Sequence, residues 1–156
     1  MVIIFLGSKS DLEIGYSIEK YLDKLAVSYK LHIASAHKTP EHLLKLLKYY
    51  ESLGKPIVYI CIAGRSNALG GFVDAQVIHP VINCPPYSEK YAGLDVLSSL
   101  RMPSGVAVTT VLDPEQAALA AAKILGLGDK KILQNISNYQ KDIKEKVIKD
   151  DHNQNG

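Results

Sequence analysis

Short, continuous apolar runs alternate along this chain with segments of helical periodicity, and this alternation restricts the possible folds more than any other feature. Five runs have the length and composition of buried strands: Val2–Leu6, Tyr29–Ala34, Pro56–Ala63, Pro80–Asn83 and Val106–Leu112. Strands that alternate with helices form parallel sheets that are covered on both faces through right-handed crossovers. The sequence therefore predicts an α/β fold of three αβα layers, with a doubly wound, mostly parallel five-stranded sheet.

Helix signals fill the intervals between these runs. Three intervals open with N-cap patterns: a Ser10–Glu13 capping box, Thr39-Pro40, and Asp113-Pro114 with Gln116. The predicted helices begin near Asp11 and cover Pro40–Leu53 and Glu115–Leu125, with shorter ones at Phe72–Asp74 and Gly93–Leu100. If the first three strands are arranged in the order 2-1-3, the sheet is of the flavodoxin-like type.

A further helical pattern follows the α/β domain, which we expect to span residues 1–128. Apolar side chains there share one stripe of a helix whose other face is polar: Ile132, Ile136, Tyr139, Ile143 and Val147. Apolar surface beyond a complete domain usually marks a contact, so residues 129–149 are expected to form an oligomerisation helix in a homo-oligomer. Residues 150–156 are polar, and we expect them to form a disordered tail.

Composition excludes several classes of function. The chain has 156 residues and a formal net charge of +2, so nucleic acid is not an expected partner. No apolar run reaches the roughly 20 residues that span a bilayer, and no signal peptide is visible, so no membrane association is expected. Cys61 and Cys84 are too few to build a tetrahedral zinc site on their own, and both are expected to be reduced. These features favour a cytoplasmic protein without a metal cofactor.

Polar residues follow the first three predicted strands, in the segments Gly7–Asp11, Ser35–Thr39 and Gly64–Asn67. In a parallel sheet these segments meet at the carboxyl ends of the strands, where ligands bind. The second segment places a titratable base, His37, beside the cation of Lys38 and close to the start of a helix. This combination suits chemistry on an anionic substrate.

Each of these residues also has a structural interpretation. His37 could be an ordinary loop histidine, and Lys38 a solvated lysine. Ser10 and Asp11 could cap a helix without contacting phosphate or ribose. Arg65 could clamp a carboxylate or phosphate, or pair with an acidic residue at a subunit contact. Spacing alone leaves these alternatives open.

Four motifs occur in one order along the chain: Gly7-Ser8-Lys9-Ser10-Asp11, Ser35-Ala36-His37-Lys38-Thr39-Pro40, Ala63-Gly64-Arg65-Ser66-Asn67 and Ser99-Leu100-Arg101-Met102-Pro103-Ser104-Gly105. Together they resemble the PurE family of purine biosynthesis, and the resemblance extends from about Val2 to Gly126. It implies an enzyme that places a carboxylate on carbon 4 of the imidazole ring of 5-aminoimidazole ribonucleotide (AIR).

The resemblance also implies roles for residues at the matching positions. His37 would be the catalytic acid and base, and carbon dioxide would meet the ring beside Gly64–Asn67. The substrate-binding residues would be Gly7, Ser8, Ser10, Asp11, Ser35, Ala36, Lys38, Gly64, Arg65, Ser66 and Asn67. The family uses no metal, biotin or ATP for this step, so no cofactor is expected.

The family has two branches, and this chain resembles the carboxylase branch, which is class II. The mutase branch, which moves a carboxylate from the exocyclic nitrogen, typically has arginine at the position of Lys38 and a glycine-alanine-histidine loop at Arg65–Asn67. The expected reaction is therefore the reversible, ATP-independent carboxylation of AIR by carbon dioxide to 4-carboxy-5-aminoimidazole ribonucleotide (CAIR). The mutase is the alternative, and a non-catalytic phosphoribosyl-binding domain is a second one. Because the family forms octamers, an octamer is expected ahead of a tetramer.

Overall fold

One parallel sheet organises the protein. The computed structural model describes residues 1–155, and its five strands lie in the order β2-β1-β3-β4-β5. They are β1 (Val2–Leu6), β2 (Tyr29–Ile33), β3 (Val58–Ile62), β4 (Val81–Asn83) and β5 (Thr109–Thr110). All four strand pairings are parallel. The predicted doubly wound five-stranded sheet is confirmed, including the 2-1-3 order of the first three strands.

Six α-helices connect or follow the strands. They are α1 (Leu12–Lys24), α2 (Pro40–Glu51), α3 (Ala68–Asp74), α4 (Leu97–Leu100), α5 (Pro114–Gly126) and α6 (Lys130–Asn155). Short 3₁₀ turns occur at η1 (Lys9–Asp11), η2 (Glu89–Tyr91) and η3 (Leu94–Val96). None of the helices within residues 1–155 is long and apolar enough to cross a membrane.

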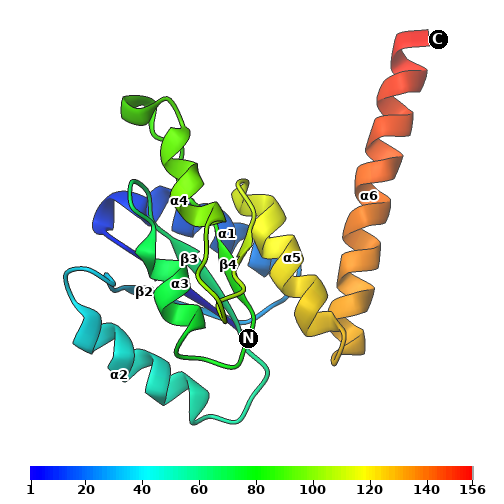
Figure 1. Ribbon diagram of the computed structural model, residues 1–156. Helices are drawn as coiled ribbons and strands as arrows, with labels where there is room; N and C mark the ends of the chain where they lie inside the picture. Colours follow the sequence, from blue (N-terminus) through cyan, green and yellow to red (C-terminus); the bar gives the residue numbers. More distant parts are fainter. Residues whose placement is uncertain (156) are drawn as a thin grey trace.

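Helices cover both faces of the sheet, with α2 and α3 on one side and α1 and α5 on the other (Figure 1). The strand residues alternate between two cores. Ile4 of β1 packs in the core that includes α1 and α5, whereas Ile3 and Phe5 pack in the core that includes α2 and α3. All residues of β1 and β3 are fully buried, which explains why the two strands are continuously apolar in sequence.

Two local predictions need correction. The predicted strand Val106–Leu112 is reduced to the two residues of β5, which pairs only with β4 and lies at the sheet edge. The reciprocal capping pair at the first helix joins Ser8 to Asp11 rather than Ser10 to Glu13. Because the 3₁₀ turn η1 precedes α1, the capping contacts form two residues earlier than the sequence pattern predicts.

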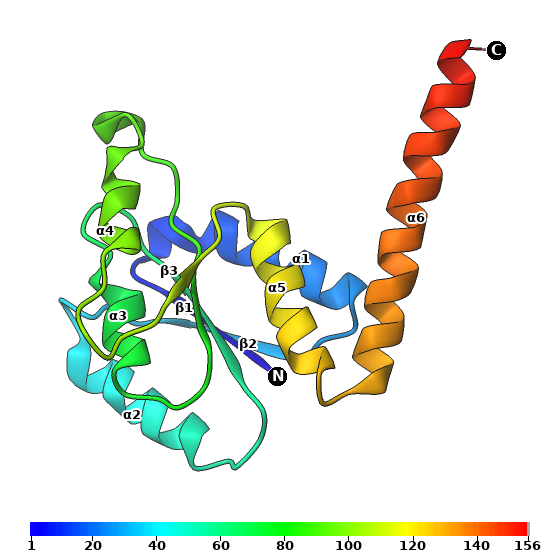
Figure 2. The ribbon, with the colours of Figure 1, turned by 45° about the vertical axis from the view of Figure 1, so that its right-hand side comes forward.

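The last helix differs most from the expectation. Helix α6 continues to Asn155, so the prediction of a disordered tail from residue 150 is wrong. A polar segment without glycine or proline does not by itself end a helix. Its first half packs on α5, where Ile136 is only 5% exposed and the Tyr139 hydroxyl donates to Glu115. Its second half projects away from the body (Figure 2). The predicted contact stripe is therefore partly covered within the chain itself.

Candidate active site

Three polar loops meet at the carboxyl edge of the sheet. Gly7 donates its N–H to the carbonyl of Ile62 at 2.8 Å, and Ala34 donates to the carbonyl of Leu6 at 2.9 Å. The loops that follow β1, β2 and β3 therefore begin side by side. A Cβ atom at Gly7 would lie 3.1 Å from the Cβ of Ala63, so the first loop passes close to the third. The sequence predicted this convergence.

The first loop is held by Asp11. One carboxylate oxygen of Asp11 accepts from the Ser8 N–H at 3.0 Å and from the Ser8 hydroxyl at 3.2 Å. The Ser8 and Ser10 hydroxyls also share a hydrogen bond. Both hydroxyls lie in or before the turn η1, and Ser10 is exposed. Two serine side chains are thus gathered where the chain turns from β1 into α1.

The second loop is braced at its two ends. Thr39 accepts the Ser35 N–H on its Oγ1 at 2.9 Å, and its own N–H donates to the Ser35 carbonyl at 3.0 Å. The Ser35 hydroxyl accepts from the N–H of Lys38 at 3.2 Å. His37 and Lys38 are exposed, and their side chains have no hydrogen bond or ion pair within residues 1–155. The brace fixes the backbone and leaves the base and the cation available to a ligand.

The third loop carries backbone strain. Arg65 has φ of +59°, a left-handed conformation that costs a non-glycine residue about 1–2 kcal/mol. Its N–H donates to a carboxylate oxygen of Asp95 at 2.8 Å. Ser98 accepts the N–H of Asn67 at 3.0 Å. The loop is therefore held from the segment of η3 and α4, about 30 residues further along the chain.

Asn67 is an exception among the predicted site residues because it is buried, with 3% of its surface exposed. Its amide nitrogen donates to the Ser99 hydroxyl at 2.9 Å. Asn83 lies nearby, and its amide nitrogen contacts the Ser99 carbonyl at 3.5 Å. The amide oxygens of Asn67 and Asn83 have no hydrogen-bond partner within the described chain. The geometry favours a role for Asn67 in holding the loop.

A glycine makes room for this polar cluster. A Cβ atom at Gly70 of α3 would lie 1.9 Å from the amide oxygen of Asn83, a distance that no side chain could tolerate. Helix α3 therefore approaches β4 closely because residue 70 has no side chain. Asp95, Ser98 and Ser99 were not among the predicted site residues. The only sequence feature that could have indicated this region was the motif Ser99–Gly105, which begins at Ser99.

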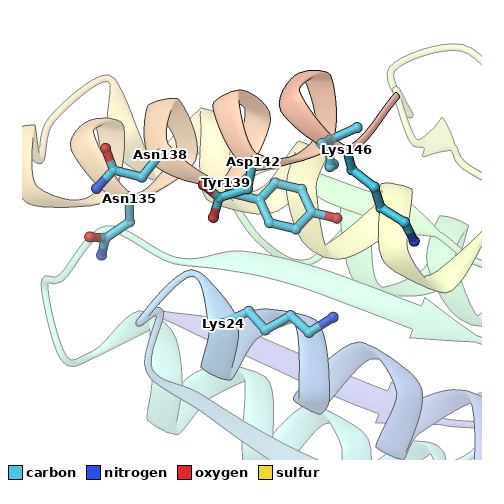
Figure 3. A pocket seen from close by; sticks show the side chains of 7 residues that line it. Lys24, Asn135, Asn138, Tyr139, Asp142 and Lys146 are labelled. Atoms are coloured by element: carbon cyan, nitrogen blue, oxygen red, sulfur yellow. The ribbon is translucent and has the colours of Figure 1, made fainter. Parts of the chain in front are cut away.

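Two cavities differ in their relation to these loops. One, of about 290 Å³, borders the third loop and is lined by Ser66, Asn67, Ala68, Gly71, Phe72, Ser98, Arg101, Met102 and Pro103. A larger one, of about 490 Å³, lies between α6 and Lys24 of α1, and Figure 3 shows Asn135, Tyr139 and Lys146 around it. The larger cavity contains none of the predicted site residues, so its size alone does not identify the site.

The two cysteines, Cys61 and Cys84, are buried and unpaired. Burial raises the pKa of the Cys84 thiol to about 12 and raises that of Cys61 as well. Thiols with such high pKa values are poor nucleophiles at neutral pH. His37 therefore remains the candidate for acid and base chemistry at this edge of the sheet.

These features define a class: a doubly wound α/β protein with braced polar loops, one of them presenting an exposed histidine, at the carboxyl edge of its sheet. The chain matches the AIR carboxylase family over residues 1–146, and it belongs to that family. The predicted resemblance to PurE proteins is thereby confirmed.

Named relatives agree with this assignment. A phosphoribosylaminoimidazole carboxylase of Treponema denticola is 48% identical over 151 residues, which cover 97% of this chain and 95% of that protein. Another, of Archaeoglobus fulgidus, is 46% identical over 149 residues, covering 96% and 82% of the two chains. The crystal structure of Treponema denticola PurE is similar with a TM-score of 0.95 at 48% identity, covering 97% of this chain and 96% of that one.

Proposed function

We propose that this chain is a phosphoribosylaminoimidazole carboxylase, which converts AIR and carbon dioxide to CAIR in de novo purine biosynthesis. The observation that carries the proposal is the exposed, unpartnered His37 on a braced loop, in a chain 48% identical to a protein named for this activity. The exposed His37 and the similarity to a named carboxylase argue against a non-catalytic phosphoribosyl-binding domain, because binding alone does not require a base at this position.

The proposed reaction needs few groups. The aminoimidazole is an enamine-like nucleophile, so carbon 4 attacks carbon dioxide and forms the new carbon–carbon bond directly. The adduct still carries a proton on carbon 4. His37 in its neutral form takes that proton, and the electrons of the broken C–H bond restore the aromatic ring. A positioned base typically contributes about 10²–10⁴-fold, and every step is reversible without ATP.

The substrate would be held by the three loops. Ser8, Ser10 and Asp11 would bind ribose and phosphate beside the first turn of α1. Ser35, Ala36 and Lys38 would complete the nucleotide site, where the lysine charge offsets that of the phosphate. Gly7 and Gly64 would allow the backbone to approach the ligand. Arg65 and Ser66 would face the incoming carbon dioxide, and Asn67 would anchor their loop from within.

Lys38 and Arg65 favour the carboxylase over the mutase, and the relatives named above carry the carboxylase name. The test supplies the purified protein with AIR and bicarbonate-derived carbon dioxide, without ATP, and follows CAIR. Formation of CAIR is expected. Efficient use of the N-carboxy compound, with no exchange of its carboxylate with solution carbon dioxide, would identify a mutase. Tight nucleotide binding without turnover of either compound would identify a binding domain.

We also propose that the protein works in the cytoplasm as a homo-oligomer, with an octamer ahead of a tetramer. Apolar side chains remain exposed on the second half of α6, where Ile143 and Val147 are 46% and 64% exposed. Light scattering should show a large assembly for the full chain and a smaller one for Ile143→Asp combined with Val147→Asp. Lys144→Glu, between them, is the control. An unchanged assembly in the double variant would exclude α6 from the contact.

A further inference from the structure

Asp95 and Ser98 lie outside the three loops, yet they bind the backbone of the third. The Asp95 carboxylate accepts the Arg65 N–H at 2.8 Å. The Ser98 hydroxyl accepts the Asn67 N–H at 3.0 Å and lies 2.9 Å from the Arg65 carbonyl and 2.8 Å from the Asp95 carbonyl. Its single proton can go to either carbonyl. Two side chains therefore hold both ends of the Arg65–Asn67 segment.

This brace explains how Arg65 keeps a conformation that its side chain disfavours. With φ of +59°, the arginine would relax to a negative φ if nothing held its backbone. Gly64 lets the loop pass close to the segment that carries Asp95, because a Cβ there would lie 3.0 Å from Pro86 and 3.6 Å from the Asp95 carboxylate. The path of the loop thus depends on Asp95 and Ser98.

We propose that Asp95 and Ser98 are positioning residues for the carboxylation: they set the backbone path that presents Arg65 and Ser66 to the substrate. The inference rests on the proposed function, since that function places Arg65 and Ser66 beside the reacting carbon dioxide. Neither Asp95 nor Ser98 is required to touch the substrate. A displacement of about 1 Å at a reacting group can lower the rate about 10²-fold, so the brace affects turnover more than binding of AIR.

The decisive variant is Asp95→Ala, with Asp95→Asn as its conservative partner. Asparagine keeps an oxygen that can accept the Arg65 N–H, whereas alanine removes the acceptor. Asp74→Ala is a matched control, because Asp74 accepts the N–H of Ala107 at 2.9 Å across a similar sequence separation. That bond ties the end of α3 to the segment before β5, and it does not involve the third loop.

The expected result is a fall of at least about tenfold in kcat/KM for Asp95→Ala, carried mainly by kcat, with KM for AIR changing less. Asp95→Asn should recover activity to within about threefold of the natural protein. Asp74→Ala should lower the Tm by a similar amount to Asp95→Ala but keep kcat/KM within about twofold. Equal kcat/KM values for folded Asp95→Ala and Asp74→Ala would overturn the proposal.

A second measurement separates the brace from the reaction. Hydrogen exchange of a peptide covering residues 62–69 should be faster in Asp95→Ala than in the natural protein and unchanged in Asp74→Ala. If the natural protein does not carboxylate AIR, the proposed function fails, and the brace is then tested by hydrogen exchange alone. Unchanged exchange of residues 62–69 in Asp95→Ala would show that Asp95 does not hold the loop. If Asp95→Ala does not fold, Ser98→Ala replaces it, and normal kcat/KM in that variant also overturns the proposal.

Discussion

The two edges of the sheet use polar side chains in opposite ways. At the amino edge, one carboxylate oxygen of Glu51 accepts from the Tyr59 hydroxyl at 2.8 Å and pairs with Nδ1 of His79 at 2.7 Å. At the carboxyl edge, His37 and Lys38 are exposed and make no such contacts within residues 1–155. Polar groups that satisfy one another stabilise the fold, whereas exposed groups on a fixed backbone are available to a ligand.

The carboxyl edge is nevertheless well ordered by hydrogen bonds. Several of these bonds join the backbone to side chains: the Ser35 N–H donates to Thr39 Oγ1, and the Arg65 N–H donates to the Asp95 carboxylate. Because these bonds hold the backbone, the side chains of His37 and Lys38 remain without a hydrogen-bond partner within residues 1–155. The comparison therefore predicts that variants at the carboxyl edge change kinetics, while variants at the amino edge change stability.

The largest expected effect is that of His37→Asn. Turnover should fall about 10²–10⁴-fold, because asparagine cannot accept the proton from carbon 4, while the fold and AIR binding persist. His42→Asn, on an exposed histidine of α2, is the control and should keep its turnover. Initial rates of CAIR formation, with circular dichroism on both proteins, provide the measurement. Near-normal turnover in folded His37→Asn would remove His37 from the mechanism.

At the other edge, Glu51→Ala should destabilise the protein by about 2–3 kcal/mol, because the buried Tyr59 hydroxyl and His79 both lose their partner. Activity per folded molecule should be unchanged. Urea unfolding and CAIR assays measure the two quantities. Glu89→Ala, at an exposed carboxylate of η2, should change stability by less than about 0.5 kcal/mol. A comparable loss in both variants would contradict the special role of Glu51.

Lys38→Ala should raise the KM for AIR about tenfold, which corresponds to about 1.4 kcal/mol, with a smaller change in kcat. Lys38→Arg should restore binding only in part, because the guanidinium is larger and planar. Lys45→Ala, on an exposed lysine of α2, is the control. If Lys38→Ala binds AIR as the natural protein does, the lysine has no role in holding the phosphate.

The smallest effect concerns acid stability. Burial alone would raise the pKa of Glu51, but hydrogen bonds from His79, Tyr59 and the Ile78 N–H outweigh it and hold the pKa below its ordinary value of 4.5. The folded protein then binds this proton more weakly than the unfolded chain does. The contribution of Glu51 to stability is therefore present above pH 4.5 and is lost as the pH falls through the lowered pKa.

This sign can be checked with Glu51→Gln. The difference in unfolding free energy between the natural protein and the variant should be largest near neutral pH and should shrink in acid. Urea unfolding at a series of pH values gives that difference. A difference that stays constant or grows in acid would mean that Glu51 does not hold a lowered pKa in the folded state.

Much of the fold follows from the sequence because strand and helix periods are local properties. The continuous burial of β1 and β3, and the cap at Asp113, which accepts from Glu115 and Gln116, are examples. Two boundaries were missed. Strand β5 is short because its partner strand β4 has only three residues to pair with. Helix α6 is long because nothing in its polar second half breaks a helix.

The site was less predictable than the fold. The three loops could be located from strand ends, because the carboxyl ends of all strands in a parallel sheet lie at the same edge. The bonds of Asp95 and Ser98 to the third loop could not, since they join residues about 30 apart through space. Nor could the sequence distinguish Asn67, which is buried, from its exposed neighbour Ser66.

The close approach of Gly70 to Asn83 has a consequence for how such a chain can change over generations. Any side chain at position 70 would collide with the Asn83 amide, at 1.9 Å from a Cβ atom. Asn83 must first become smaller, for example serine, before alanine can be accepted at position 70. The two substitutions are therefore expected to depend on the order in which they arise, so that Asn83→Ser is permissive and Gly70→Ala alone is lost to selection.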